Sequence, residues 1–292
     1  MKNLRSLLFM PGNNPGMLVS ADNLGADAII YDLEDAVSLT EKDAARDLVR
    51  HALETIPFEN SYVTVRINPT DSPYWKEDLE AVLPCEPDGI VIPKASVESF
   101  REVETYIENH WKARGIDRKD CDLRFLMLVE TARGITEVEQ IAQASSRIDA
   151  LLLGGEDYSV SMGIARTKES KELEYARFRL ATAAKAFGKD AIDTPYTDVE
   201  DFDGLEADTR FVRSIGMNGR LVINPRQLPI IHDVFSPTSS ELEAAQAILH
   251  EAEKAREEGL GVFSYRGKMV DKPVIDRAKN LVRSAREWGM IE

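Results

Sequence analysis

Short apolar runs alternate with longer amphipathic stretches along the chain. The runs are rich in strand-forming residues, and we expect eight of them to be strands: residues 6–10, 28–33, 62–67, 89–93, 125–130, 150–153, 191–193 and 220–224. They recur at intervals of roughly 25 to 35 residues, which is the length of one βα unit. Eight such units close a barrel, so the pattern predicts an α/β fold, a TIM (β/α)8 barrel. The seventh run is weak, and we include it because a closed barrel requires it.

The stretches between the runs repeat their apolar residues with the period of a helix. Residues 169–187 place apolar side chains on one face, and Gly188 follows as a typical helix stop. Residues 44–53 repeat this pattern, and the segment that begins at Thr40 resembles an N-terminal capping box. We therefore expect helices to alternate with the strands.

The chain continues beyond the eighth predicted strand. Residues 239–258 and 273–288 have helical patterns, and a segment punctuated by glycines, residues 259–271, separates them. A closed barrel does not need this tail, so we expect it to cover a barrel mouth, its own or a neighbour's. The prediction is a catalytic barrel domain over residues 1–235 and an additional C-terminal helical segment over residues 236–292.

The charge of the chain limits its partners. A formal net charge of −15 argues against a nucleic-acid partner, because nucleic-acid binding depends on cationic contacts to phosphates. The same charge fits a site in which carboxylates gather around a cation. An anionic substrate would then need a local Arg, Lys or metal ion to bind.

We expect a cytoplasmic protein that neither crosses nor binds a membrane. No apolar run approaches the ~20 residues needed to cross a bilayer. The apolar segment of residues 6–10 is too short for the core of a signal peptide, and no small-residue cleavage site follows it. The two cysteines, Cys85 and Cys121, do not form a Cys-x-x-Cys pair, which argues against a zinc site. A disulfide between them is not expected in a reducing compartment.

Polar side chains follow nearly every predicted strand. In α/β barrels the chemistry lies at the C-terminal ends of the strands. At these ends the chain carries, in order, residues 11–16, Asp32, Glu34 and Asp35, Arg66 and Asn68, Lys94, Glu130, residues 154–157, Asp193 and Thr194, and Asn224. Crowded carboxylates repel one another and add little to folding. A divalent cation is the simplest way to relieve that repulsion.

Glu130 and Asp157 are the expected metal ligands. Glu130 ends an almost wholly apolar run, so its charge must be used or paired. Asp157 follows two glycines, which let a backbone and a ligand approach closely. A helix cap or an ion pair would also explain Glu130, and a turn would also explain Asp157. Together, on adjacent strands, they predict a two-carboxylate site that suits Mg²⁺.

Arg66 and Lys94 end the third and fourth predicted strands. The guanidinium of Arg66 could bind a substrate carboxylate or a developing enolate oxygen, or it could form a buried pair with Glu34 or Asp35. Lys94 could be a Schiff-base amine, although an ion pair with the carboxylates is the favoured interpretation.

Histidine does not supply the expected general base. The four histidines all lie in predicted helices: His51, His110, His232 and His250. A carboxylate or a lysine must then serve. The loop that begins with Pro11, Gly12 and Asn13 is either a simple turn or a backbone that approaches the phosphate or pantetheine arm of a thioester.

The chain resembles the citrate lyase beta subunits, within the wider family of citrate lyases, malyl-CoA lyases and HpcH/HpaI aldolases. The resemblance covers essentially the whole chain, and its short motifs have a specific order and spacing. The segments that carry it are residues 8–14, 32–37, 65–68, 93–94, 130–135, 154–158, 223–227, 259–262 and 267–271.

This resemblance implies a barrel with Mg²⁺ on Glu130 and Asp157 and a substrate-binding arginine at Arg66. It also implies a catalytic aspartate, matching Asp271, in a C-terminal segment that covers the active site of a neighbouring subunit. A homo-oligomer, a trimer or a multiple of one, follows from the same resemblance. Asn224 stands where many stand-alone acyl-CoA lyases have histidine. In this it is similar to citrate lyase beta subunits, which work with an acyl-carrier gamma subunit and a transferase alpha subunit.

The implied reaction is the Mg²⁺-dependent cleavage of a citryl thioester, carried on an acyl-carrier protein or on CoA, to oxaloacetate and an acetyl thioester. Arg66, Asn68 and Glu130 are expected to contact the substrate, and Asp271 to exchange the proton of the enolate carbon. The residues expected to support the site are Glu34, Asp35, Lys94 and Asn224.

Three alternatives stay open. A malyl-CoA or citramalyl-CoA lyase or synthase would use the same carbon–carbon chemistry. A Schiff-base aldolase would use Lys94. A non-catalytic subunit would dock an acyl carrier, but the intact carboxylate pair and Arg66 argue against it.

Overall fold

The structure is a computed structural model that describes residues 4–116, 122–257, 259 and 261–291. Cys121 lies outside the described residues, so the absence of a disulfide stays a prediction. Within the described part of the chain, no helix is both long and apolar enough to cross a membrane.

Eight parallel strands form a closed barrel in chain order. They are β1 (Ser6–Pro11), β2 (Ala28–Asp32), β3 (Tyr62–Arg66), β4 (Gly89–Ile92), β5 (Arg124–Val129), β6 (Ile148–Leu153), β7 (Asp190–Asp193) and β8 (Gly219–Val222). β8 pairs with β1 and closes the ring. The predicted TIM barrel is therefore confirmed. Each predicted strand is present within two residues of its expected bounds, the weak seventh one included.

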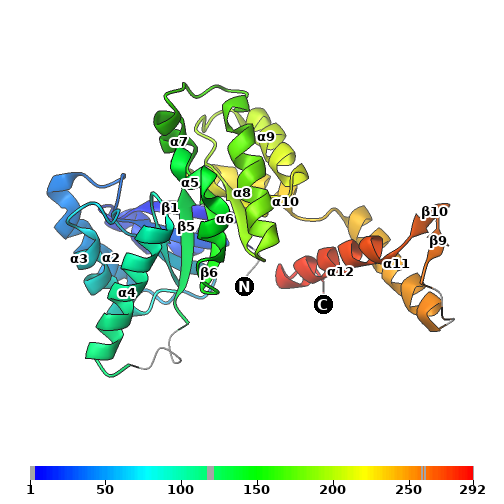
Figure 1. The fold of residues 1–292 in the computed structure, drawn as a ribbon, viewed down its shortest axis with the longest axis horizontal. Coiled ribbons are helices and arrows are strands. Elements are labelled where there is room, and N and C mark those ends of the chain that lie inside the picture. The colour runs from blue at the N-terminus through cyan, green and yellow to red at the C-terminus, as the bar shows by residue number, and fades with distance from the viewer. Residues whose placement is uncertain (1–3, 117–121, 258, 260, 292) are drawn as a thin grey trace. The chain divides into compact units, whose positions relative to one another are not determined.

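Helices follow the strands and surround them (Figure 1). They are α1 (Pro15–Ser20), α2 (Lys42–Thr55), α3 (Trp75–Val82), α4 (Val97–Ala113), α5 (Ala132–Thr136), α6 (Val138–Gln143), α7 (Gly155–Met162), α8 (Glu174–Ala186), α9 (Phe202–Ser214) and α10 (Leu228–Phe235). Helix α8 ends before Gly188, which has a positive φ of 65° as a helix stop requires.

The start of α2 differs from the predicted capping box. Thr40 lies in a 3-10 turn (Leu39–Glu41), and the N-cap is Glu41, whose side chain does not cap the helix. The Glu41 carboxylate instead accepts a hydrogen bond from the Asn13 amide at 2.7 Å. The predicted helix is present, but its predicted cap is wrong because the cap residues bond elsewhere.

Alternate residues of each strand point into the barrel and form its core. The inward set includes Leu7, Ile30, Leu128, Leu152 and Leu221, all buried. Because side chains alternate along a strand, the residues two positions further on continue the same inward row at the C-terminal end. This row leads directly to the polar side chains of the site.

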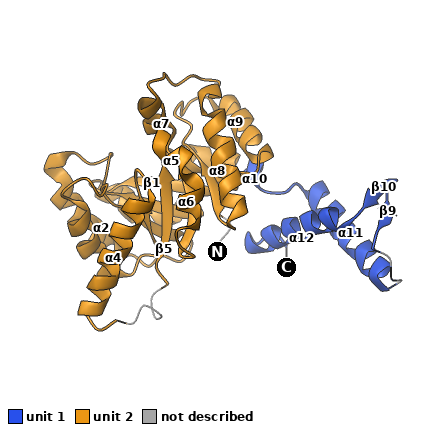
Figure 2. Cartoon of the chain, in the orientation of Figure 1, with its two compact units in different colours: residues 1–3, 233–292 blue, residues 4–232 orange. Residues whose placement is uncertain are grey.

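Two compact units make up the described chain (Figure 2): a barrel unit, residues 4–232, and a C-terminal unit that begins at residue 233. The C-terminal unit contains α11 (Ser239–Glu257) and α12 (Lys272–Glu287). These two helices pack through a small apolar core. Its buried members are Ala245, Ala278 and Val282.

The glycine-punctuated segment of this unit contains a hairpin that the sequence analysis missed. Strands β9 (Phe263–Tyr265) and β10 (Lys268–Val270) pair antiparallel around Arg266 and Gly267. Both turn residues have positive φ, 49° and 74°, as a two-residue hairpin turn of this twist requires. The glycine at the second turn position was the available signal.

Candidate active site

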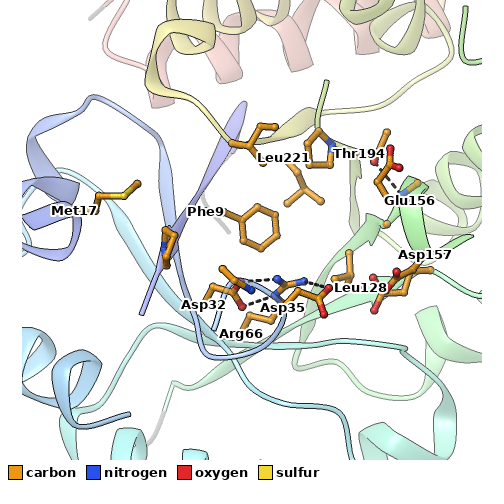
Figure 3. A pocket seen from close by; sticks show the side chains of 17 residues that line it. Phe9, Met17, Asp32, Asp35, Arg66, Leu128, Glu156, Asp157, Thr194 and Leu221 are labelled. Atoms are coloured by element: carbon orange, nitrogen blue, oxygen red, sulfur yellow. Dashed lines mark hydrogen bonds and ion pairs between the residues drawn. The ribbon is translucent and has the colours of Figure 1, made fainter. Parts of the chain in front are cut away.

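A cavity of about 440 Å³ opens at the C-terminal ends of the barrel strands (Figure 3). It is lined by Phe9, Pro11, Met17, Asp32, Asp35, Ala36, Arg66, Leu128, Glu130, residues 154–157, Thr194, Pro195, Leu221 and Ile223. Its strand residues continue the inward rows of the core: Asp32 follows Ile30, Glu130 follows Leu128, and Thr194 follows Ile192. The barrel thus brings Arg66, Glu130 and Asp157, the main predicted site residues, to one cavity.

Arg66 lies buried in the wall of the cavity, with 8% of its surface exposed. Its Nε and Nη2 donate to the two carboxylate oxygens of Asp32 at 2.7 and 2.6 Å. Its Nη1 lies 2.9 Å from Glu34 Oε2, an ion pair without the alignment of a hydrogen bond. The guanidinium carbon lies 4.8 Å from the centre of the Phe9 ring. Burial opposes the charge of Arg66, but the attraction of Asp32 and Glu34 outweighs it and raises the pKa of Arg66.

These contacts leave part of the guanidinium available to a ligand. Arginine has five N–H donors in a planar fork, and the bidentate pair with Asp32 uses two of them. The ion pair with Glu34 occupies one side of Nη1. Because Arg66 lines the cavity, its remaining donors can bind an oxyanion there.

Glu130 is held at the base of the cavity. It is 3% exposed, and its Oε1 accepts a hydrogen bond from the backbone N–H of Lys94 at 2.6 Å. Burial raises the pKa of Glu130 to about 8, and the neighbouring charges of Glu34 and Asp157 add to the rise. The carboxylate therefore lacks enough positive charge around it.

Asp157 lies in the first turn of α7 and is half-buried at the same cavity. Burial raises its pKa, and the charge of Asp35 adds to that rise. Two oxygen ligands with too little countercharge fit a divalent cation. Within the described ranges, no group of three or more His, Cys, Asp or Glu side chains is arranged for a metal. A cation bound by Glu130 and Asp157 alone would keep coordination positions for water and substrate, as Mg²⁺ does.

Glu34 and Asp35 lie beside Arg66, where the sequence analysis expected them. Glu34 is buried, and burial raises its pKa to about 7 against the opposing effect of Arg66. Asp35 is exposed, lines the cavity and lies 3.8 Å from Arg66 Nη1. The loop that carries both residues is tied down by buried Lys42, whose ammonium donates to the carbonyl oxygens of Leu33 and Glu34 at 2.7 Å each.

Lys94 presents its backbone, rather than its amine, to the site. Its side chain is exposed and lines a neighbouring cavity of about 340 Å³, together with Ser96 and Arg133. Lys94 forms no ion pair with any residue that the structure describes. Its charge nevertheless lowers the pKa of Asp157 from a longer range. The ion pair that was the favoured interpretation of Lys94 is therefore not observed. Because the Lys94 side chain lies in the neighbouring cavity, the geometry also gives no support to a Schiff base at the Arg66 cavity.

Asn68 and Asn224 lie near the strand ends but bond within the protein. Asn68 is buried, and its amide group donates to Leu33 O at 2.9 Å and to Asp78 Oδ2 at 2.7 Å. Both amide hydrogens are then in use. The Asn224 side chain accepts from Arg226 N at 3.0 Å and starts a short 3-10 turn. The predicted contact of Asn68 with the substrate and the predicted supporting role of Asn224 stay predictions.

In the first loop, only Pro11 of its three candidate residues lines the cavity. Gly12 N donates to Asp32 O at 2.9 Å, and a Cβ on Gly12 would lie 2.7 Å from that oxygen. The side chain of Asn13 bonds to Glu41. The polar groups of Gly12 and Asn13 therefore shape the turn, while Pro11 and Met17 give the cavity an apolar edge.

Asp271 belongs to the C-terminal unit. It is the N-cap of α12, where its Oδ1 accepts a hydrogen bond from Val274 N at 3.3 Å. Its catalytic role stays a prediction.

Two residues without a predicted role shape the site. Asp32 is the bidentate partner of Arg66, and Phe9 stacks on the guanidinium. Their signal was position: each lies on a strand, two residues beyond a core residue of the barrel interior. Asp32 was expected at the strand end, but its partner was not predicted.

Comparison with known proteins places these features in a family. The family model for HpcH/HpaI aldolase/citrate lyase matches residues 5–225. Citrate lyase subunit beta of Leuconostoc mesenteroides subsp. cremoris is 39% identical over 289 residues, covering 99% of this chain and 95% of that protein. Human mitochondrial citramalyl-CoA lyase is 30% identical and covers 96% of this chain and 85% of its own length.

A solved structure also matches. Protein CitE from Mycobacterium tuberculosis, in complex with magnesium, acetoacetate and coenzyme A, has a TM-score of 0.77 and 28% sequence identity, covering 97% of this chain and 98% of that one. The family model spans the barrel that carries Arg66, Glu130 and Asp157. The chain therefore belongs to the HpcH/HpaI aldolase/citrate lyase family.

Proposed function

We propose that this protein is a Mg²⁺-dependent carbon–carbon lyase that cleaves a citryl thioester to oxaloacetate and an acetyl thioester, as the beta subunit of a citrate lyase. The observation that carries the proposal is the single cavity that joins Arg66 to the undercompensated carboxylates Glu130 and Asp157. The 39% identity to a citrate lyase beta subunit over 99% of the chain supports the choice of substrate. The solved relative that binds magnesium and coenzyme A supports both the metal and the thioester.

Glu130 and Asp157 would hold the Mg²⁺ ion. When bound, Mg²⁺ polarises the hydroxyl and carboxylate oxygens of the substrate and lowers the pKa of the hydroxyl. The raised pKa values of the two side chains support this assignment, because the charge of a nearby cation would offset the burial and the like-charge repulsion that raise them. Glu34 and Asp35 would fix Arg66 and the ordered waters around the site.

Cleavage needs one proton removed and one delivered. Transfer of the hydroxyl proton to a carboxylate or lysine base lets the oxygen form a ketone while the bond to the methylene carbon breaks. The bonding electrons pass to the acetyl thioester as an enolate, and a proton added at its carbon completes the acetyl thioester. The free donors of Arg66 would stabilise the enolate oxygen or a substrate carboxylate, and Asp271 would supply the proton.

The apolar edge of the cavity gives the thioester arm a path. Pro11 and Met17 line this edge, and an alkyl–amide chain such as pantetheine can pack against such side chains. We propose that the arm arrives on an acyl-carrier subunit, in a complex that also contains a transferase subunit.

The direct test incubates the purified chain with citryl-CoA and measures oxaloacetate with a coupled malate dehydrogenase. We expect cleavage with Mg²⁺ that EDTA abolishes and that E130Q and D157N each lose. Activity that survives in EDTA would contradict the metal assignment. No cleavage of any acyl thioester, with or without partner subunits, would favour a docking subunit instead.

The place of Asp271 has its own test, because the proposal puts it over a neighbour's site in a homo-oligomer. The inactive variants D271N and E130Q are mixed, dissociated and reassembled. Recovered activity in the mixture supports a site shared between subunits. Activity that stays absent, while each variant still assembles, indicates that Asp271 acts in its own chain.

A second candidate is a citramalyl-CoA or malyl-CoA lyase, which the 30% identity to human citramalyl-CoA lyase favours. These substrates lack the second carboxylate arm of the citryl group. Comparing kcat/KM for citryl-CoA, citramalyl-CoA and malyl-CoA decides between them.

A further inference from the structure

Two residues, Lys94 and Gly154, hold the side chain of Glu130 in place without contacting it through side chains of their own. The backbone N–H of Lys94 donates to Glu130 Oε1 at 2.6 Å. Gly154 lies at the end of the neighbouring strand β6. A Cβ built on Gly154 would lie 2.5 Å from both Glu130 Cβ and Glu130 Oε2. Atoms do not approach this closely, so the side chain of Glu130 occupies the space that a larger residue would fill.

Gly154 is required for its size rather than for its backbone conformation. Its φ of −94° is one that other residues adopt readily. Its N–H donates to Val129 O at 3.1 Å, so β6 places its Cα directly against the end of β5. Because Gly154 has no side chain, the side chain of Glu130 can occupy the space beside it.

Lys94 meets Glu130 with its backbone rather than with its amine. It has a φ of 47°, in the left-handed region that costs a residue with a side chain about 1–2 kcal/mol. Strained positions of this kind persist only where the surrounding structure holds them in place. Here the left-handed turn after β4 aims the N–H at Glu130, while the lysine side chain lies exposed in the neighbouring cavity.

We propose that Gly154 and the backbone of Lys94 form a cradle that fixes the Glu130 carboxylate in its metal-binding position. Lys94 N–H binds Oε1, and Gly154 admits Oε2 against the end of β6. Both act as positioning residues through Glu130. The inference rests on the proposed role of Glu130 as a metal ligand. Three strand ends, those of β4, β5 and β6, are then needed to place one carboxylate.

The cradle explains why a buried carboxylate can stay in one place before a cation arrives. A ligand held in its binding rotamer loses little conformational entropy when the metal binds. Groups that orient a metal ligand affect metal affinity by about 10–100-fold. Their removal should therefore change affinity for the metal itself, apart from any effect on turnover.

The experiment measures Mn²⁺ binding by electron paramagnetic resonance, with Mg²⁺ as competitor, on the full chain. G154A is expected to weaken Mn²⁺ binding by about 10–100-fold. G155A is the matched control, because its Cβ would meet Thr194 Oγ1 at 2.7 Å instead of Glu130. G155A should lower the Tm to a similar extent and change Mn²⁺ affinity by less than about threefold. Equal losses of affinity in the two variants would overturn the cradle.

A second pair tests the Lys94 side and stays informative if G154A does not fold. K94G and K94V both remove the amine, but only glycine adopts the left-handed conformation without cost. K94G is expected to keep the wild-type Mn²⁺ affinity, and K94V to lose about tenfold or more. Equal losses in both variants would show that the amine matters and would overturn the proposal.

If Glu130 is not a metal ligand at all, the binding measurements give a different pattern from the one expected when only the cradle is wrong. If the wild-type chain binds no Mn²⁺, or if E130Q binds it as tightly as wild type, Glu130 is not a metal ligand and the cradle falls with it. If wild type binds and E130Q does not, while G154A and K94V bind normally, only the cradle is overturned.

Discussion

Two buried arginine–carboxylate clusters in the barrel unit use the same chemistry with different charge balance. The cavity cluster has one arginine, Arg66, against Asp32 and Glu34. The second cluster lies between the barrel and its helices and has two arginines, Arg177 and Arg220, against two aspartates, Asp193 and Asp208.

The charge balance of each cluster is reflected in the pKa of one of its acids, Glu34 in the cavity cluster and Asp208 in the second cluster. In the cavity cluster, burial outweighs the single arginine and raises the pKa of Glu34 to about 7. In the second cluster, burial also opposes ionisation, but the combined effect of Arg220 and Arg177 outweighs it and lowers the pKa of Asp208. A balanced cluster is complete by itself and supports the fold. An unbalanced one that faces a cavity still has room for another cation, which marks it as a functional site.

The largest expected effect separates the clusters by activity. R66K keeps the charge but loses the planar fork that binds Asp32 and the substrate oxyanion at once. We expect kcat/KM for citryl-CoA to fall by about 100- to 1000-fold. R177K, the same substitution in the second cluster, should leave kcat/KM per folded molecule within about threefold of wild type. Equal losses would mean that the second cluster also controls the site.

The second effect separates the clusters by stability. R177M leaves three of the four charged groups buried without balance, and removing one partner of a buried pair typically costs about 3–5 kcal/mol. We expect a loss of that order in the free energy of unfolding, measured by urea denaturation. A loss well below 1 kcal/mol would show that the network contributes little to the fold.

The third effect is on stability, which should depend on pH in opposite directions for the two clusters. Glu34 and Glu130 bind protons more tightly when folded, with pKa values of about 7 and 8 against an ordinary 4.5. The metal-free protein should therefore lose stability as pH rises from about 5 through 8, on the order of a few kcal/mol. Asp208, with a lowered pKa, gives stability that is lost as pH falls below about 4.

Thermal unfolding from pH 4 to 9 checks both signs. E130Q should flatten the loss above pH 5, because glutamine does not ionise. Mg²⁺ should raise the Tm more at pH 8 than at pH 5, since the carboxylates are then free to bind it. Identical Mg²⁺ effects at both values would contradict the assignment of these carboxylates.

The smallest effect concerns the ring that covers Arg66. F9L keeps an apolar wall but removes the cation–π contact at 4.8 Å, worth about 1–2 kcal/mol for a cation that is largely removed from water. We expect a roughly five- to thirtyfold fall in kcat/KM with little change in Tm. No change would indicate that the acids alone position the guanidinium.

The sequence determined the architecture and most of the polar rim. The eight apolar runs predicted every barrel strand, and strand-end position brought forward Arg66, Glu130 and Asp157, which the structure unites in one cavity. The hairpin of the C-terminal unit was missed because its two strands are only three residues long, too short for a period to show.

Which strand-end residues face the cavity could not be predicted from the sequence and depends on the folded barrel. Asp32 and Asp193 both end apolar strands, yet Asp32 lines the cavity and Asp193 pairs with Arg177 behind the barrel. In an amphipathic strand, the alternation of apolar and polar residues would have shown which of the two aspartates points inward. The strands of a parallel barrel are buried on both faces and so are apolar on both, which erases the alternation from the sequence. The inward row is fixed by strand register and barrel closure, and these depend on all eight strands together.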